Sequence, residues 1–472
     1  MMGFQPVVLW TDLLLFGLVG CIALAAWSAR RSEPMRAAWG RVGASGVGMT
    51  SLTLLLLFVL VGLVDSLHYR ERLVPAGAEA AGAKPQLSSE VRSALDALAE
   101  PLRTRVEKTY SAPLAWQLFA KQTVEGKDGA QHREFPRLKY GGAGLKYPEQ
   151  DLPGDVAGRI TMGLAAAAGG WLVLAGLVVG LVARARRVPF GAGWRAVWRG
   201  KGGLAWRAML LTLAGVLLVV GPLAALATEY HVFGTDKVGQ DVLFLTLKSI
   251  RTALVIGTLT TLVTLPLAVV LGVVAGYLGG WVDDVIQYLY TVLNSIPGVL
   301  LIAAAVLMMQ GVIDTHPQWF ETAAERADAR LLALCLILGM TSWTGLCRLL
   351  RGETLKLREL EYVQAARAFG VSTRRILASH VLPNLMHLIL IALVMDFSGL
   401  VLAEAVLSYV GIGVDPNTIS FGTMINAARM ELAREPMVWW SLMAAFIFMF
   451  VLVLAANLFA DVVRDAFDPR AS

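Results

Sequence analysis

Long apolar runs separated by short polar loops make up most of the chain. Each run is long enough, as a helix rising about 1.5 Å per residue, to cross about 30 Å of hydrocarbon. We predict nine membrane spans, at about 8–28, 46–66, 161–183, 206–227, 250–277, 294–312, 331–348, 384–410 and 438–460. The pattern indicates an all-α polytopic membrane protein.

The composition supports this class. Hydrophobic residues make up 56% of the chain and charged residues 16%, whereas about a quarter of the residues in a soluble domain are charged. The net charge is +6, but the basic residues lie in short loops beside the spans, so we expect membrane lipid and no nucleic acid as a partner. Cys21, Cys335 and Cys347 lie within or at the end of apolar runs, so we expect neither a disulfide framework nor a metal site.

Arginine-rich loops predict the orientation, because cytoplasmic loops carry an excess of positive residues. Three such loops fall on one side if the N-terminus lies outside and the C-terminus lies in the cytoplasm. Their basic residues are Arg30, Arg31, Arg36 and Arg41; Arg184, Arg186, Arg187, Arg195, Arg199 and Lys201; and Arg348, Arg351, Lys356, Arg358, Arg367, Arg374 and Arg375.

Residues 67–160 form one large hydrophilic segment, which this orientation places outside. Apolar residues recur at helical spacing between Leu87 and Tyr110, so we expect a helix there, with Ser88 or Ser89 as its cap. The rest is rich in Gly and Lys and is expected to form loops. The segment is either a lid or partner-docking module, or a tolerated surface insertion.

The loop 353–383 between two spans contains a short amphipathic helix that begins at Glu361. Tyr362, Val363, Ala366 and Phe369 fall on one face. Gly370 suits a left-handed cap, Ser372 or Thr373 can start a second, basic helix, and Pro383 suits the first turn of the next span. Such a helix either lies on lipid headgroups or docks on a partner outside the membrane.

The same loop resembles a known motif. Ala365-Ala366-x-x-x-Gly370, followed by Ile376 and Leu382-Pro383, resembles the EAA loop of ABC importer permeases. Other motifs stand in order: Phe233-Gly-Thr-Asp236-x-x-Gly239-x-Asp241-Val, Ala275-Gly-Tyr-x-Gly-Gly-Trp281-Val-Asp283, Leu402-Ala-Glu404-Ala-x-Leu-Ser-x-x-Gly411-x-Gly413 and Arg464-Asp-x-x-Asp468-Pro-Arg470. Together they are similar to the dipeptide/oligopeptide/nickel permease family, in its C-type subunit, over roughly 230–472.

The resemblance implies a domain organisation. The six-span core of a type I ABC importer permease would occupy 206–472, with its coupling loop at 353–383. Three additional N-terminal spans and an external insertion would precede the core: two spans in 1–66, the external hydrophilic segment in 67–160, and a third span with a basic cytoplasmic loop in 161–205.

The resemblance also implies a function. The chain would be a permease subunit of the bacterial cytoplasmic (inner) membrane that translocates peptides or similar small solutes. Its partners would be a second, homologous permease, two ATPase subunits and an external solute-binding protein. We expect no enzyme activity and no bound cofactor, because the chain has no G-x-x-x-x-G-K-[ST] stretch to cradle ATP phosphates. ATP would be used by the ATPase subunits.

The resemblance assigns roles to particular residues. The ATPase-docking coupling helix would use Glu361, Tyr362, Val363, Gln364, Ala365, Ala366, Phe369 and Gly370. Two departures from the family pattern are Gln364, where an acidic residue is usual, and Gln240, where a basic one is usual. They leave open a second reading, a degenerate permease that acts as a membrane scaffold or sensor through its external segment 67–160.

Two further sets of residues have alternative roles. Glu404 and Asp396 lie in one apolar run, where a carboxylate is costly unless it is paired or meets water. Each either lines or gates the translocation pathway or makes a buried hydrogen bond between helices. Gly234, Thr235, Asp236, Gly239 and Asp241 form an external motif that provides either turn and cap chemistry or a contact with the partner permease. Asp283 and Asp284 are expected to form a solvated cap.

Overall fold

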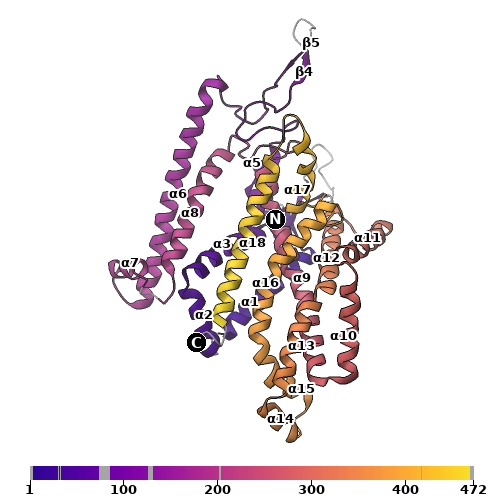
Figure 1. Ribbon diagram of the computed structural model, residues 1–472. Helices are drawn as coiled ribbons and strands as arrows, with labels where there is room; N and C mark the ends of the chain where they lie inside the picture. Colours follow the sequence, from indigo (N-terminus) through magenta and orange to yellow (C-terminus); the bar gives the residue numbers. More distant parts are fainter. Residues whose placement is uncertain are drawn as a thin grey trace.

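The computed structural model describes residues 4–29, 31, 33–73, 86–125, 131–200, 203–415 and 417–467 (Figure 1). Its membrane-spanning part is helical, and eight helices are long and apolar enough to cross a membrane: Gly46–Asp65, Pro148–Arg186, Trp206–Ala227, Val242–Leu278, Gly298–Thr315, Ala323–Arg358, Thr373–Val410 and Trp440–Phe467. Each overlaps one predicted span. The remaining prediction overlaps helix α1, in which Trp10–Leu24 forms a shorter apolar helix. The polytopic all-α class is confirmed.

In chain order the elements run from β1 to α18. The first half contains β1 (Phe4–Val7), α1 (Trp10–Ala29), α2 (Glu33–Ala44), α3 (Gly46–Asp65), β2 (His68–Leu73), β3 (Gln86–Ser93), α4 (Ala94–Leu98), α5 (Glu100–Thr104), β4 (Gln122–Glu125), β5 (Gln131–Glu134), α6 (Pro148–Arg186), α7 (Phe190–Trp198) and α8 (Trp206–Ala227). The second half contains α9 (Val242–Leu278), α10 (Gly280–Ser295), α11 (Gly298–Thr315), η2 (Pro317–Trp319), α12 (Ala323–Ser342), α13 (Thr344–Arg358), α14 (Glu361–Ala368), α15 (Thr373–Ile376), the π-helical η3 (Leu377–Val381), α16 (Leu382–Val410), α17 (Phe421–Arg429), η4 (Glu431–Ala433) and α18 (Trp440–Phe467).

Helix α9 is the centre of the bundle. It packs against α3, α12, α13 and α16, and most of its length is buried. Small residues allow the closest of these approaches: a Cβ added at Gly272 would lie 2.7 Å from the carbonyl oxygen of Cys347, and one at Gly276 would lie 2.6 Å from that of Arg351. Small residues let helices approach closely in membranes, where dispersion contacts replace the hydrophobic effect.

Helix α3 is part of this bundle. It packs against α9, α18 and α8, whereas α6 packs against α8 and α7. Figure 1 shows the α6–α8 hairpin standing beside the bundle, with α3 between them. The division of the chain at residue 206 stays a prediction, but α3, which that division assigns to the added N-terminal part, is packed inside the bundle.

Buried ion pairs fasten the N-terminal part to α9. Lys248 Nζ lies 2.7 Å from Asp65 Oδ1 and 3.1 Å from Asp96 Oδ1, and an Arg251 guanidinium nitrogen lies 2.6 Å from Asp12 Oδ1. Asp12 and Asp65 are almost fully buried. A charge buried in a span is tolerated when it is paired, so these carboxylates and cations hold one another in place.

The helix predicted from Leu87 to Tyr110 is wrong over most of its length: only Ala94–Leu98 and Glu100–Thr104 are helical, residues 105–110 are irregular, and the predicted caps Ser88 and Ser89 lie in a strand. Residues Gln86–Ser93 form β3, which pairs antiparallel with β2, itself paired with β1. The first helical turn begins after Ser93, which forms a capping box with Asp96. In residues 86–93, hydrogen bonding to β2 therefore decides the conformation, although the spacing of the apolar residues also fits a helix. A second antiparallel pair, β4 and β5, forms the hairpin at the top of Figure 1.

Candidate functional site

The short helix α14 lies at the lower end of the molecule, between α13 and α15 (Figure 1). It begins with Glu361 in the first turn, where a carboxylate favours the helix dipole. It is closed by Gly370, whose φ of 75° is left-handed, and by a hydrogen bond of 3.1 Å from the Val371 amide to the Ala366 carbonyl. The prediction of a left-handed glycine cap is confirmed.

The apolar residues of α14 point in two directions. Val363 is 1% exposed and belongs to a core cluster with Leu350 and Ile376, against which Ala366 also packs. Phe369 is 88% exposed. The expected single apolar face is therefore divided: one side anchors the helix to its own chain and the other is exposed.

The other predicted residues of this helix lie at its surface. Tyr362 is 45% exposed, and its hydroxyl accepts a hydrogen bond of 3.1 Å from Asn384 Nδ2 at the start of α16. Glu361, Ala365 and Gly370 are exposed as well. The helix thus presents small, polar and aromatic side chains outward while it is fixed from beneath.

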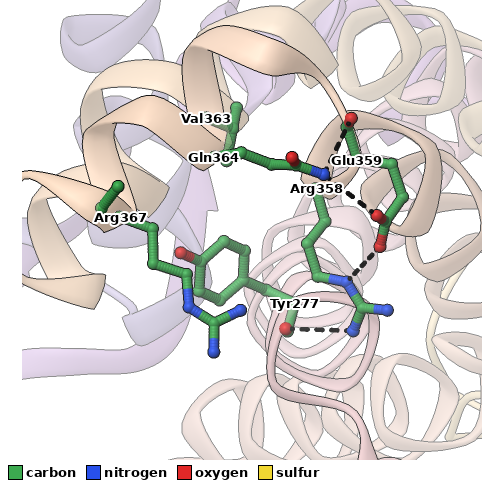
Figure 2. A pocket seen from close by; sticks show the side chains of 7 residues that line it. Tyr277, Arg358, Glu359, Val363, Gln364 and Arg367 are labelled. Carbon is green, nitrogen blue, oxygen red and sulfur yellow. Dashed lines mark hydrogen bonds and ion pairs between the residues drawn. The ribbon is translucent and has the colours of Figure 1, made fainter.

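A cavity of 590 Å³ opens between α14, the end of α13 and the end of α9 (Figure 2). It is lined by Tyr277, Arg358, Glu359, Val363, Gln364, Arg367 and Ala368. Gln364 Nε2 donates at 3.2 Å to both the Glu359 carbonyl and its Oε2 atom. A carboxylate cannot donate these bonds. The glutamine that replaces the acidic residue of the EAA loop is therefore satisfied within its own chain.

The segment after Gly370 is more continuous than expected. Instead of a second helix ending at Pro383, one apolar helix runs over Thr373–Val410, with a π-helical turn at Leu377–Val381. Proline has no N–H, and its ring crowds the carbonyl four residues earlier. For Pro383 that carbonyl belongs to residue 379, which lies inside the wider π-helical turn. Ser372 takes the N-cap position without a side-chain hydrogen bond. Pro383 lies in the first turn of α16, as predicted.

Asp283 contradicts the expectation of a solvated cap. It is buried in the first turn of α10, where its Oδ2 atom accepts a hydrogen bond of 2.6 Å from an Arg351 guanidinium nitrogen of α13. Arg351 lowers the pKa of Asp283 through this hydrogen bond, and the gain outweighs the desolvation of the carboxylate. Asp284 is exposed. The pair joins α10 to α13 close to the loop that carries α14.

Glu404 is fully enclosed. It is 1% exposed, and its Oε1 atom accepts hydrogen bonds from Ser408 Oγ at 2.6 Å and from Ser420 Oγ at 2.9 Å. Ser420 is also the N-cap of α17, so the carboxylate ties α16 to α17. This geometry favours the buried hydrogen bond over pathway lining. Asp396, two turns earlier, is half-buried.

The external motif forms the loop before α9 and contacts the external segment. Asp241 caps α9 by accepting from the amides of Leu243 and Phe244. Thr235 Oγ1 accepts from the Ser111 amide at 2.6 Å. A Cβ added at Gly239, which has a φ of 80°, would lie 1.9 Å from the carbonyl oxygen of Glu107. Turn and cap chemistry is present, and the loop contacts the chain's own insertion and also α18, where Trp440 Nε1 donates to the Thr235 carbonyl at 3.0 Å.

The remaining motif residues shape the same loop. Gly234 is left-handed, with a φ of 69°, and packs against the Ser111 carbonyl. Asp236 Oδ1 accepts from the amides of Val238 and Gln240 at 3.0 and 2.8 Å. The side chain of Gln240 is exposed. The loop uses only the backbone of this residue, so its conformation does not need the usual basic side chain.

A buried charge cluster holds the contact. His231 Nδ1 lies 2.7 Å from Asp241 Oδ2, and its Nε2 atom lies 3.6 Å from Glu107 Oε1. Burial alone would lower the pKa of His231, but its hydrogen bond to Asp241 and the negative charges of Asp241 and Glu107 raise the pKa to about 9. Burial would raise the pKa of Glu107, but His231 and the amides of residues 139–141 lower it to about 2.

Comparison with known proteins decides the family. Residues 268–472 match the family model described as "Binding-protein-dependent transport system inner membrane component". The chain is 34% identical to the oligopeptide transport system permease protein OppC of Mycobacterium bovis over 241 residues, which are 51% of this chain and 76% of that protein. The chain belongs to this permease family.

Other relatives agree. The dipeptide transport system permease protein DppC of Lactococcus lactis subsp. cremoris is 33% identical over 245 residues, 52% of this chain and 65% of that protein. The glutathione transport system permease protein GsiD of Pectobacterium atrosepticum is 31% identical over 242 residues, 51% of this chain and 73% of that protein. The chain is a multi-pass permease of the inner membrane that serves an ABC importer, and such permeases are transport subunits, not enzymes.

The family match includes α14, Glu404 and the Asp283–Arg351 pair. Sequence reasoning missed this pair, the His231–Glu107 contact and the ion pairs of Lys248 and Arg251. The signal for the last group was present in the sequence, because charged residues at the ends of apolar runs need partners. The Asp468-Pro-Arg470 motif lies outside the described residues.

Proposed function

We propose that this permease is one of two homologous membrane subunits of an importer for peptides or similar small solutes. Two ATPase subunits would dock on the α14 side, and a solute-binding protein would deliver the solute on the opposite side. The names of the relatives, which are permeases for oligopeptides, dipeptides and glutathione, support this class of solute. The N-terminus would lie outside and the C-terminus in the cytoplasm, in keeping with the arginine-rich loops.

One observation supports the docking site most strongly: α14 has a buried anchor, and its C-cap residue is an exposed phenylalanine. Val363 is 1% exposed and Phe369 is 88% exposed. An unpartnered phenylalanine on a rigidly held surface helix is the kind of anchor that fills a pocket in a partner. Movement of the ATPase would therefore push the helix as a unit instead of bending it.

The pushing force has a direct route into the membrane. After the single turn at Gly370, the chain enters one helix that runs over Thr373–Val410. Val363 and Ile376 share one apolar cluster with Val381 and Leu385 of that helix. Displacement of α14 would thus tilt α16 and rock the bundle between inward-open and outward-open states, with ATP hydrolysed on the ATPase and no cofactor held by this chain.

The carboxylates of α16 take different roles in this scheme. Glu404, enclosed by two serine hydroxyls, keeps α17 attached to α16 while the bundle moves. Asp396, which is half-buried on the same helix, is the better candidate for lining the pathway between the two permeases, because a carboxylate in a span that is open to water need not pair with a cation.

The test is co-purification combined with uptake. A tagged chain is extracted from native membranes in mild detergent, and the wild type is compared with Phe369→Asp and with a matched control, Phe135→Asp, which changes a phenylalanine that is 41% exposed on the external segment. We expect the wild type and the control to retain a P-loop ATPase, a second permease and ATP-driven uptake.

Phe369→Asp should keep the second permease but lose the ATPase, because removal of an aromatic anchor weakens a protein interface by about 2 to 4 kcal/mol, or roughly 30- to 1,000-fold. Gly370→Asp, which forces a side chain into the left-handed cap, should have the same effect. Normal uptake in Phe369→Asp would contradict the docking role. A folded chain that recovers neither protein would favour a scaffold or sensor.

A further inference from the structure

The α6–α8 hairpin carries a strongly one-sided charge at one end. No Asp or Glu occurs between Asp155 and Glu229. Within that stretch, residues 184–207 contain seven basic residues: Arg184, Arg186, Arg187, Arg195, Arg199, Lys201 and Arg207. So many positive charges in a short segment repel one another, and anions bound from outside the segment would reduce this repulsion.

The basic segment is folded against the ends of two membrane spans. Helix α7 connects α6 to α8 and lies across their lower ends in Figure 1. Val197 is 1% exposed and clusters with Val182 of α6 and Leu210 of α8. A Cβ added at Gly193 would lie 2.8 Å from the Ala183 Cβ. Because α7 is packed directly on the span ends, it lies at the level of the lipid headgroups.

The outward side of this end combines cations with apolar surface. Arg184, Arg187, Arg195 and Arg199 are exposed, and we call these four residues the basic cap. Phe190, beside them, is 54% exposed. The tryptophans at 194, 198 and 206 are partly buried at the same level, where amphipathic aromatic rings concentrate at a membrane boundary.

We propose that the basic cap binds the headgroups of anionic phospholipids. Clustered cationic side chains beside a span are attracted to anionic headgroups through their charge, and the exposed Phe190 offers an apolar contact for the acyl chains beside those headgroups. We favour lipid over an acidic protein as the ligand because the basic cap lies at the ends of the two spans α6 and α8, next to the lipid headgroups. The inference rests on α6 and α8 spanning the membrane and does not depend on which solute the permease carries.

The lipid site would also steady a part of the molecule that has few other supports. The hairpin reaches the bundle mainly through α8 and α3, and α6 packs only on α8 and α7 among the element pairs with substantial contact in the described residues. Headgroups bound at the cap would hold the free end of the hairpin at the membrane surface, as a polybasic segment beside a span does.

The test uses the purified full-length permease in detergent, titrated with phosphatidylglycerol or with phosphatidylcholine, and bound lipid is counted by native mass spectrometry. We compare the wild type with the double variant Arg195→Gln/Arg199→Gln, with the charge-conserving Arg195→Lys/Arg199→Lys, and with Arg36→Gln. Arg36 is an exposed basic residue of α2, outside the basic cap, and one of its guanidinium nitrogens lies 3.9 Å from Glu33 Oε1. Thermal unfolding checks that each variant is folded.

We expect the wild type to bind phosphatidylglycerol in preference to phosphatidylcholine. In the double Gln variant the phosphatidylglycerol concentration at the titration midpoint should rise about 30-fold, because each basic residue near an anionic surface contributes about fivefold to the affinity. The double Lys variant and Arg36→Gln should stay within about threefold of the wild type, since charge at the cap is retained. No lipid preference, or equal binding by the folded double Gln variant, would overturn the proposal. Loss of a co-purifying acidic protein with unchanged lipid binding would also overturn it and assign the cap to that protein.

Discussion

The contact between the external segment and the loop before α9 should weaken as the pH rises. The imidazolium of His231 lies between Asp241 of the loop and Glu107 of the external segment. Its pKa is raised from 6.5 to about 9. A group whose pKa rises on folding stabilises the folded contact fully below its unfolded pKa, and this stabilisation is lost as the pH rises through the folded value. The window therefore runs from pH 6.5 to about 9.

The size of the effect follows from the shift. One pKa unit corresponds to about 1.4 kcal/mol, so the contact should lose about 3 kcal/mol across this window, a change of roughly two orders of magnitude in the open population. Glu107 does not oppose the change, because its pKa is lowered from 4.5 to about 2. Its own contribution is present above pH 4.5 and disappears only as the pH falls through about 2.

Limited proteolysis of the external segment measures the open population, provided that the segment opens and closes faster than it is cleaved. The permease is held in lipid nanodiscs, and cleavage rates are divided by those of an unstructured reference peptide at each pH. The wild type should be cleaved roughly 100-fold faster at pH 9 than at pH 6.5. His231→Gln, which cannot be charged, should be cleaved fast at both values.

Gly239→Ala provides a control that acts without titration. Its Cβ would overlap the Glu107 carbonyl, 1.9 Å away, so cleavage should be faster at both pH values while the ratio between them changes little. A wild-type ratio no larger than that of His231→Gln would refute the assigned role of the imidazolium. The segment would then be held by its backbone contacts alone.

Two further predictions concern single carboxylates. Asp283→Asn should lower the stability of the purified permease by about 2 kcal/mol, because it leaves the Arg351 guanidinium without its counter-charge; thermal unfolding measures this, and Asp284→Asn, at an exposed position, should stay within about 0.5 kcal/mol of the wild type. Glu404→Gln should keep ATP-driven uptake because the amide oxygen still accepts from a serine hydroxyl, whereas Glu404→Leu should cost about 3 kcal/mol by leaving two buried hydroxyls without an acceptor. Loss of uptake in a folded Glu404→Gln complex would instead show that the charge itself acts in transport.

The sequence predicted what depends on local chemistry. Spans follow from apolar length, so each predicted span overlaps a helix. The left-handed conformation of Gly370 follows from the lack of a Cβ, and the cap at Asp241 follows from its oxygen next to free helical amides. These features need no knowledge of what lies across the fold.

Features that depend on distant partners were not predicted. The residues of β3 have apolar spacing that also fits a helix, and only pairing with β2 decides for the strand. From its local sequence Asp283 is predicted to be a solvated cap, because its partner Arg351 lies 68 residues later in the chain. Val363 is buried and Phe369 is exposed because the apolar cluster beneath α14 reaches Val363 but not Phe369. Helical periodicity predicts which side of the helix is apolar, but it does not predict how many residues of that side are covered.

The ion pairs of α9 join the N-terminal part of the chain to the bundle. Lys248 and Arg251 would be costly charges at the end of a span if they were unpaired. Asp65 and Asp96 pair with Lys248 and Asp12 pairs with Arg251, and all three lie before residue 160; Arg251 also lies 4.0 Å from Asp328 Oδ1 of α12. Removal of that part would leave both cations without these carboxylates inside a tightly packed bundle. The N-terminal part is therefore joined to the transport bundle by buried ion pairs as well as by apolar packing.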